Sequence, residues 1–200
     1  YANESTSLVK DDPRSSHASV WMYLERVPLF VYAPGIVEPS DNTDRVTLAD
    51  LAPTAAHLMG FDGFRAPEGR VLPGIERPAT PPKVVVTFVI DGGGWNVLQH
   101  WDDPDDAKTS WPEMKRLMRG SATYRDAIVG TFPAVTACAH ATIGTGAFPR
   151  THGITGHNLR YEGHPTKAWG EPGRRGLVFV HGGAAHAHWW THVAATFPPH

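Results

Sequence analysis

The sequence has a single cysteine, Cys138, among its 200 residues. One cysteine excludes an intramolecular disulfide framework and any zinc site built from several cysteines. No apolar run approaches the roughly 18 residues of a membrane-spanning helix, and the polar first residues give no sign of a signal peptide. We therefore expect a soluble chain with no membrane partner. Because the chain begins with Tyr1 instead of Met, we expect a processed product or part of a longer protein.

A strong charge of one sign is also lacking. The 18 Lys and Arg residues against 20 Asp and Glu give a formal net charge of −2, which argues against a nucleic-acid partner. A hydrophobic share of 41% excludes an intrinsically disordered chain. What the sequence does have is 20 Gly, 18 Pro and 12 His, which predict many turns and leave histidine metal chemistry open.

Strand and helix patterns alternate along the chain. Apolar runs predict strands at residues 27–32, 84–90, 123–129 and 177–180. Helical spacing predicts helices at residues 50–60, 111–118, 136–146 and 187–196. The run Val84–Ile90 is the strongest strand signal and fits a central strand covered on both faces. The alternation predicts an α/β fold with a mostly parallel sheet flanked by helices, and the stretch Pro67–Pro82 is the best candidate linker.

Asp91 follows the strongest predicted strand and is itself followed by three glycines. In open α/β sheets, ligands bind beyond the carboxyl ends of the strands. A carboxylate there, with glycines that allow close approach, suits a divalent cation. The alternative is that Asp91 only caps the turn into the next helix.

Thr136 opens a predicted helix of small residues, 45 positions after Asp91. Its hydroxyl would lie at the positive end of the helix dipole, where anions are favoured. A hydroxyl in that position can act as a nucleophile when a metal or a base activates it. The alternatives are a simple threonine N-cap, or small residues that serve close helix packing.

Together, strand-Asp-Gly, Thr136-x-x-x-His140, Gly-Thr-Gly and the element Phe148–Ile154 resemble the type I phosphodiesterase/nucleotide pyrophosphatase family of the alkaline phosphatase superfamily. The resemblance covers roughly residues 83–170. It implies an alkaline-phosphatase-like fold and metal-dependent hydrolysis of a small phosphoester or nucleotide, with two zinc ions as the expected cofactor. Thr136 would be the nucleophile that forms a covalent phospho-Thr, and His140 a positioning or packing residue.

The resemblance also assigns ligands. Asp91 and Thr136 would bind metal, and either His157 or Asn158 would hold the phosphoryl oxygens, although the family usually has its Asn at the first of these two positions. An earlier part of the chain, within residues 1–76, resembles the C-terminal part of phosphatase and sulfatase domains. There His17 is a possible metal ligand, with a simple surface histidine as the alternative.

The order of these two pieces is inverted relative to the family. A permuted arrangement, a degenerate preceding copy and a boundary between fused units are all compatible with it. The family also needs further Asp and His ligands after the nucleophile, yet the last Asp of the chain is Asp126 and no Asp-His pair occurs. Asp11, Asp12 or Asp44 could supply carboxylates, but a complete two-metal site within these residues is not expected, and the fold is predicted to be incomplete.

The C-terminal stretch 174–198 resembles the first strand and oxyanion-hole turn of α/β-hydrolases, through Gly176–Gly183. That family needs a Gly-x-Ser-x-Gly elbow, and no serine follows Ser121. The sequence therefore predicts three units: residues 1–76, 83–172 and 174–200. An esterase-like fragment and a catalytically inactive fragment are the alternatives to a phosphoester hydrolase.

Overall fold

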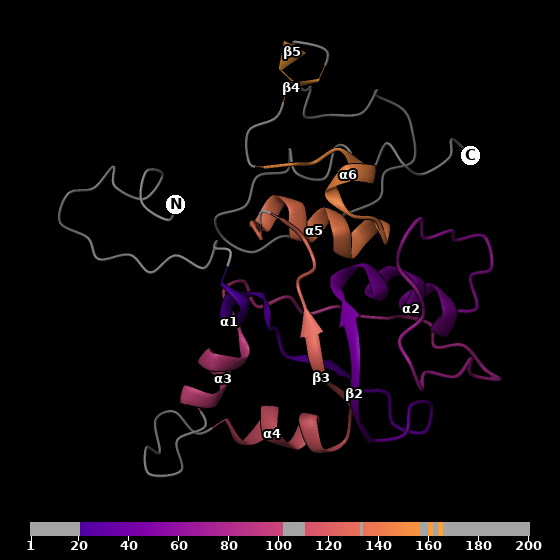
Figure 1. Cartoon of the computed structure of the whole chain (residues 1–200). Coiled ribbons are helices and arrows are strands. Elements are labelled where there is room, and N and C mark those ends of the chain that lie inside the picture. The colour runs from indigo at the N-terminus through magenta and orange to yellow at the C-terminus, as the bar shows by residue number, and fades with distance from the viewer. Residues whose placement is uncertain (1–20, 102–110, 133, 157–159, 162–163, 166–200) are drawn as a thin grey trace.

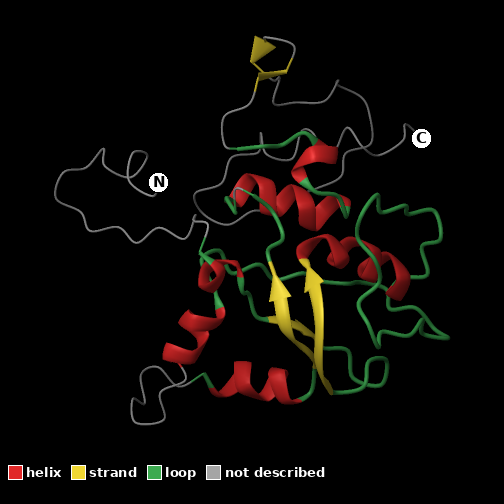
Figure 2. Ribbon diagram, in the orientation of Figure 1, coloured by secondary structure: helices red, strands yellow, loops and turns green. Residues whose placement is uncertain are grey.

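The computed structural model describes residues 21–101, 111–132, 134–156, 160–161 and 164–165. Its helices are α1 (Met22–Glu25), η1 (Leu48–Asp50), α2 (Leu51–Leu58), α3 (Trp95–Trp101), α4 (Pro112–Arg119), α5 (Thr136–Thr145) and α6 (Pro149–His152). Its strands are β1 (Leu29–Val31), β2 (Ser40–Thr47), β3 (Ala122–Ile128), β4 (Arg160–Tyr161) and β5 (His164–Pro165). Figure 2 shows the helices packed around one small sheet.

The main sheet has three strands in the order β1-β3-β2. The central strand β3 pairs antiparallel with β1, where Phe30 faces Thr123, and parallel with β2, where Val46 faces Ala127. Helices α2 and α5 lie across the carboxyl ends of β2 and β3, and α4 lies at their opposite ends (Figure 1). The predicted α/β class is confirmed. The described main sheet is mixed, so a mostly parallel, alkaline-phosphatase-like sheet is not confirmed.

The helices follow the sequence signals closely. The predicted helix 50–60 is present as η1 and α2, and Gly60 ends it with a φ of 68°. The predicted helix 136–146 is α5, whose C-cap is Gly146 at a φ of 65°. Both glycines adopt the left-handed conformation that commonly stops a helix. The predicted strand 177–180 and helix 187–196 lie outside the described residues.

The prediction of a strand at Val84–Ile90 is wrong for this structure. Among the residues that the structure describes, the segment pairs with no strand, and Phe88 is 88% exposed. Of this run, Val85 is the residue that packs against the core. A β-branched run fits a pleated, half-buried surface but becomes a strand only when a neighbour completes its hydrogen bonds.

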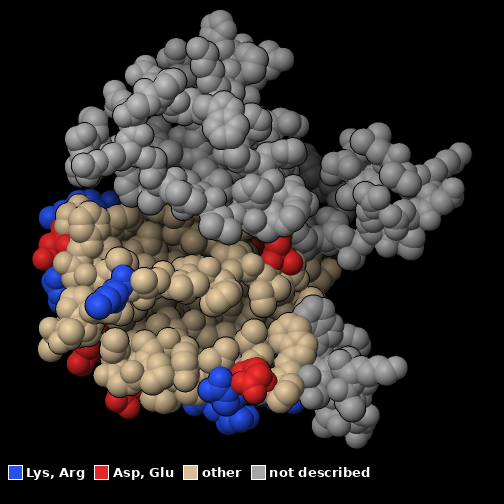
Figure 3. Space-filling model, turned by 180° about the vertical axis from the view of Figure 1, so that it is seen from behind, with Lys and Arg blue, Asp and Glu red and all other residues tan. Residues whose placement is uncertain are grey.

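Seen from behind, the described surface is largely uncharged at its middle and carries its charged groups toward the rim (Figure 3).

Strand β2 was not predicted, because its sequence is polar. It forms one edge of the described sheet, and its only fully buried side chain is Val46. Its charged residues pair with those of the central strand: Arg45 Nε lies 2.9 Å from Asp126 Oδ2. An edge strand with one solvated face needs few apolar residues, so its pattern carries little strand signal.

The stretch Pro67–Pro82 belongs to the same core as the strands. Leu72 and Ile75 are buried in a cluster with residues of β1, β2, α2 and β3. The hydroxyl of the buried Tyr124, on β3, donates to the Pro73 carbonyl at 2.7 Å, and burial raises the pKa of this phenol to about 12. The described parts of residues 1–76 and 83–172 therefore share one sheet and one core.

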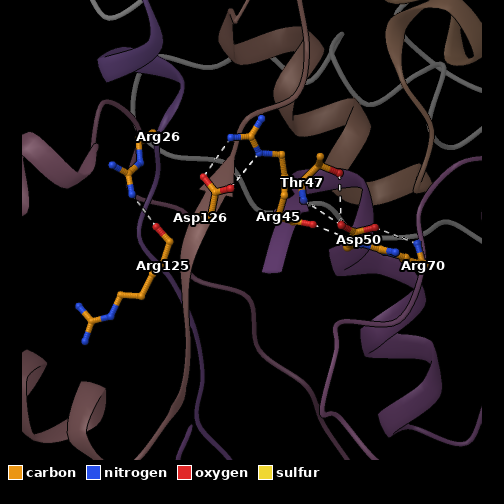
Figure 4. A network of polar contacts seen from close by, with 7 residues as sticks. All are labelled: Arg26, Arg45, Thr47, Asp50, Arg70, Arg125 and Asp126. Carbon is orange, nitrogen blue, oxygen red and sulfur yellow. Dashed lines mark hydrogen bonds and ion pairs between the residues drawn. The ribbon is translucent and has the colours of Figure 1, made fainter. Parts of the chain in front are cut away.

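Asp50 fixes the start of that stretch. Its carboxylate accepts hydrogen bonds from the backbone N–H groups of Thr47, at 2.8 Å, and of Arg70, at 2.9 Å (Figure 4). Gly69, next to Arg70, lies so close to η1 that a Cβ would be 2.0 Å from the Ala49 carbonyl oxygen. Only glycine allows this approach.

Gly69→Ala is expected to lower the free energy of unfolding by about 3 kcal/mol, the upper end of the range for overpacking, because the clash is with backbone. Gly35→Ala is the matched control, since Gly35 has a φ of 75° and its Cβ would meet nothing within 4 Å. The control should lose only the left-handed strain, about 1–2 kcal/mol. Urea unfolding of both variants measures the difference, and equal losses would contradict the close packing of Gly69.

Candidate active site

Thr136 and Asp91 lie together at the carboxyl end of β3. The Thr136 hydroxyl, in the first turn of α5, donates to Asp91 Oδ2 at 3.1 Å. The helix N-cap is Val135, and no side chain caps this helix, so the alternative of Thr136 as N-cap does not hold. Two residues 45 positions apart in the sequence are thus in direct contact. The N-terminus of the helix favours an anion, and the carboxylate beside it favours a cation, so both could be held at this point.

Two turns position this pair. After β3, Gly130 adopts a φ of 74°, and a Cβ there would lie 3.1 Å from the Thr47 side chain and 3.2 Å from Phe148. The chain can therefore turn toward α5 only with glycine at this point. After Asp91, the glycine turn leads into α3, whose Trp95 N–H donates to the Arg26 carbonyl at 3.3 Å.

Glu25, at the end of α1, holds the first of these turns. Its backbone carbonyl accepts from the Val129 N–H at 2.8 Å, and its carboxylate accepts from the Gly130 N–H. Burial raises the pKa of Glu25 above its usual value of 4.5, and the Gly130 hydrogen bond lowers it by less. Sequence reasoning missed this residue, because no motif links it to a turn about 100 positions away.

Helix α5 is packed through its small residues. Ala137, Cys138 and Ala141 are buried, and the helix contacts η1, α2 and α6. Small side chains let α5 approach η1 closely, and this fixes the height of Thr136 above the sheet. Burial raises the pKa of the Cys138 thiol to about 11, so this cysteine is a structural side chain and not a thiolate nucleophile.

Two histidines brace α5. His140 Nδ1 lies 2.9 Å from the Thr136 carbonyl oxygen, and because a carbonyl only accepts, Nδ1 donates. His152, at the end of α6, accepts from the Ile154 N–H through Nδ1 at 3.0 Å, and its Nε2 lies 3.1 Å from the Thr142 hydroxyl. The Phe148–Ile154 element is thereby held against the helix that bears Thr136.

Glu68 joins the same element to the Pro/Gly-rich stretch. Its carboxylate accepts from the Phe148 backbone N–H and from Arg150. These contacts, the Phe148 hydrogen bond first, hold the pKa of Glu68 below its usual value of 4.5. Nothing in the sequence pattern singled out Glu68, since its partners lie 80 and 82 positions away.

The other predicted site residues are not all placed. His17, His157 and Asn158 lie outside the described residues, so their roles stay predictions. In the part of the chain that the structure describes, no group of three or more His, Cys, Asp or Glu side chains could hold a metal ion. The carboxylate of Asp91 and the hydroxyl of Thr136 are oxygen groups of the kind that a divalent cation accepts, and their role as metal ligands stays a prediction.

A hydroxyl at a helix N-terminus beside a carboxylate, at the end of a sheet strand, is compatible with the class of hydrolases that use a hydroxyl nucleophile. The sequence matches the family model described as type I phosphodiesterase/nucleotide pyrophosphatase over residues 85–196, more than half of the chain. The chain belongs to this family. The match runs into the stretch 174–198, whose resemblance to α/β-hydrolases stays a prediction.

Two curated proteins are similar to shorter parts of the chain. The first, named alkaline phosphatase PhoV, from Synechococcus elongatus, is 34% identical over 77 residues, which are 38% of this chain and 13% of that protein. The second, named calcium-transporting ATPase, from Myroides odoratus, is 32% identical over 78 residues, 39% of this chain and 14% of that protein. The match thus spans about one seventh of the length of these relatives. No solved structure matches the chain.

The helices of the described residues include none that is both long and apolar enough to cross a membrane.

Glu25→Gln is expected to stabilise the fold at neutral pH, because glutamine keeps the acceptor for Gly130 without a half-buried charge. A raised folded pKa means that the stability contributed by Glu25 is present below its unfolded pKa, near 4.5, and is lost as the pH rises through the folded value. Thermal unfolding of the parent and the variant from pH 4 to pH 8 measures this. The advantage of the variant should grow as the pH rises from 4 to 8, and a difference that does not change with pH would contradict the prediction.

Proposed function

We propose that the chain carries the nucleophile region of a metal-dependent phosphoester hydrolase that acts on a small phosphodiester or nucleotide. The observation that carries the proposal is the hydrogen bond from Thr136 Oγ1 to Asp91 Oδ2, 3.1 Å, at the N-terminus of α5. The family to which residues 85–196 belong supports the reaction class.

The proposed reaction has two steps. Thr136 Oγ gives up its proton to solvent and attacks the phosphorus, the bond from phosphorus to the leaving oxygen breaks, and the phosphoryl group is transferred to Thr136 while the leaving oxygen takes up a proton from solvent. Water then attacks the phospho-Thr, which releases phosphate or a phosphomonoester and restores the hydroxyl. Asp91 Oδ2 accepts a hydrogen bond from the Thr136 hydroxyl and thereby orients Oγ toward the substrate.

The N-terminus of α5 favours the negative charge of the phosphoryl group. The helix is 10 residues long, and its first N–H groups have no partner within the helix. Partial positive charge at this end attracts phosphate oxygens. By the family resemblance, His157 or Asn158 would add a hydrogen bond to the same oxygens.

Divalent cations, two zinc ions by the resemblance, would be held by Asp91, Thr136 and His17, together with ligands still to be identified. When bound, they would lower the pKa of the Thr136 hydroxyl and stabilise charge on the leaving oxygen. The oxygen donors of Asp91 and Thr136 fit such ions, and the histidine fits zinc in particular.

Thr136→Ala is expected to lower turnover of a chromogenic phosphodiester by about 10³-fold or more, because the nucleophile is removed. Thr136→Ser should keep a measurable part of the activity, since serine keeps a hydroxyl on the same carbon. Thr80→Ala, at an exposed position, is the matched control and should leave turnover unchanged.

The same assay, run with zinc and with a chelator, tests the metal. The parent chain should lose its turnover on chelation and regain it when zinc is restored. Turnover that survives both the chelator and Thr136→Ala would contradict the proposal. An absence of turnover in the parent with zinc present would favour a catalytically inactive fragment.

A further inference from the structure

The run Val84–Ile90 presents an apolar face to solvent. Val85 packs against the core, Thr87 is half-buried, and Val89 is less exposed than any even-numbered member of the run. The even-numbered side chains are each more than half exposed: Val84, Val86, Phe88 and Ile90. This period of two is the pattern of a strand with one face on the core and one in solvent. A contiguous exposed apolar face of this kind marks an interaction site.

The backbone of the same run is open to pairing. Within the described part of the chain, one of its groups takes part in a backbone hydrogen bond: the Ile90 carbonyl accepts from the Gly93 N–H at 2.9 Å. The run contains no proline, so each of its residues keeps a donor as well as an acceptor. A row of N–H and C=O groups beside apolar side chains is a template to which another strand can add.

Two opposite charges frame the run at equal distances from its centre. Lys83 precedes it, Asp91 follows it, and Thr87 is the midpoint between them. When two copies pair antiparallel around Thr87, each residue lies opposite the one that is equally far on the other side of Thr87. Lys83 of each copy then lies opposite Asp91 of the other, so both ends of the ladder have an attractive pair. A parallel pair would place like charges side by side, which is repulsive.

The same register keeps the apolar faces together. Val84 lies opposite Ile90 and Val86 opposite Phe88, so the exposed side chains of both copies gather on one face of the ladder. Aromatic and β-branched side chains are favourable cross-strand partners. The arrangement maps each copy onto the other by a two-fold rotation, as a closed dimer requires.

Asp91 can pair across the ladder without leaving Thr136. Its Oδ2 accepts from the Thr136 hydroxyl at 3.1 Å, and a carboxylate has about four acceptor positions on its two oxygens. Lys83 is exposed and has a long side chain, so its ammonium can reach the other oxygen.

The C-terminal apolar run Leu177–Val180 is a poorer mate for this segment. It has four residues, against seven in Val84–Ile90. Its nearest acid, Glu171, is six positions from its start, whereas Lys83 directly precedes Val84. The match in length and in charge therefore favours a second copy of Val84–Ile90.

We infer that Val84–Ile90 is a self-association strand, through which two copies of the chain pair antiparallel around Thr87 and form a closed dimer. The pairing supplies the neighbour that the run lacks among the described residues. It does not depend on the proposed function.

Oxidative cross-linking tests the register. Opposite residues of an antiparallel pair have Cβ atoms about 4.5–5.5 Å apart, close to the span of a disulfide, so Thr87→Cys should give a disulfide-linked dimer. Val84→Cys is the control at a more exposed position, and its two cysteines would lie about 20 Å apart and should stay reduced. The parent should not cross-link, because Cys138 is buried.

Sedimentation equilibrium over a range of chain concentrations tests the charges. Lys83→Glu should raise the dissociation constant of the dimer about 10-fold or more, because two attractive cross-strand pairs become repulsive. Arg119→Glu makes the same change of charge at an exposed position of α4 and should alter the constant less than about 2-fold at physiological salt. Combining Lys83→Glu with Asp91→Lys restores opposite charges and should return the constant toward the parent value.

A parent chain that stays monomeric at every concentration overturns the inference, as do open-ended assemblies in place of dimers. Equal cross-linking of Thr87→Cys and Val84→Cys also overturns it, because random collisions have no register. The cross-linking result keeps the inference testable if the variant with both charges exchanged has a lowered unfolding midpoint.

Discussion

The pairing of β3 with two strands that come from the first third of the chain is the constraint on which the rest of the structure depends. Because β3 lies between β1 and β2, its carboxyl end and the turn at Gly130 are fixed over η1 and α2. The buried Tyr124 strengthens this pairing, since its hydroxyl donates to Pro73 and so joins β3 to the Pro/Gly-rich stretch as well. Helix α5 then packs on η1 through small residues, and its first residue, Thr136, reaches Asp91.

This arrangement bears on the unusual order of the two pieces in the sequence. The segment 1–76 supplies β1, β2 and α2, and the family-matched segment 85–196 supplies β3 and α5. The two are joined by strand ladders and by one buried cluster that includes Leu72 and Ile75. The described parts of these two segments therefore form one packed unit, whatever the origin of their order in the sequence.

Sequence reasoning found the parts of the fold whose signals are local. The helices α2 and α5 end at glycines that the sequence marks, and Asp91 and Thr136 are adjacent in space although 45 residues separate them. It failed where the outcome depends on neighbours. Val84–Ile90 has the composition of a buried strand and pairs with no strand of the described residues, whereas the polar β2 becomes a strand because β3 offers it hydrogen bonds. Glu25 was missed for the same reason, because about 100 residues separate it from its partners after β3.

The central claim is that Thr136 accepts the phosphoryl group. Its most direct test is to quench the zinc-supplied chain with acid during turnover of a phosphodiester, digest it, and search the peptides by mass spectrometry for a covalently bound phosphoryl group. The account predicts that the group is found on the peptide that contains Thr136 and that fragmentation assigns it to this residue. Turnover without a phosphorylated Thr136, or a phosphoryl group trapped on another side chain, would contradict it.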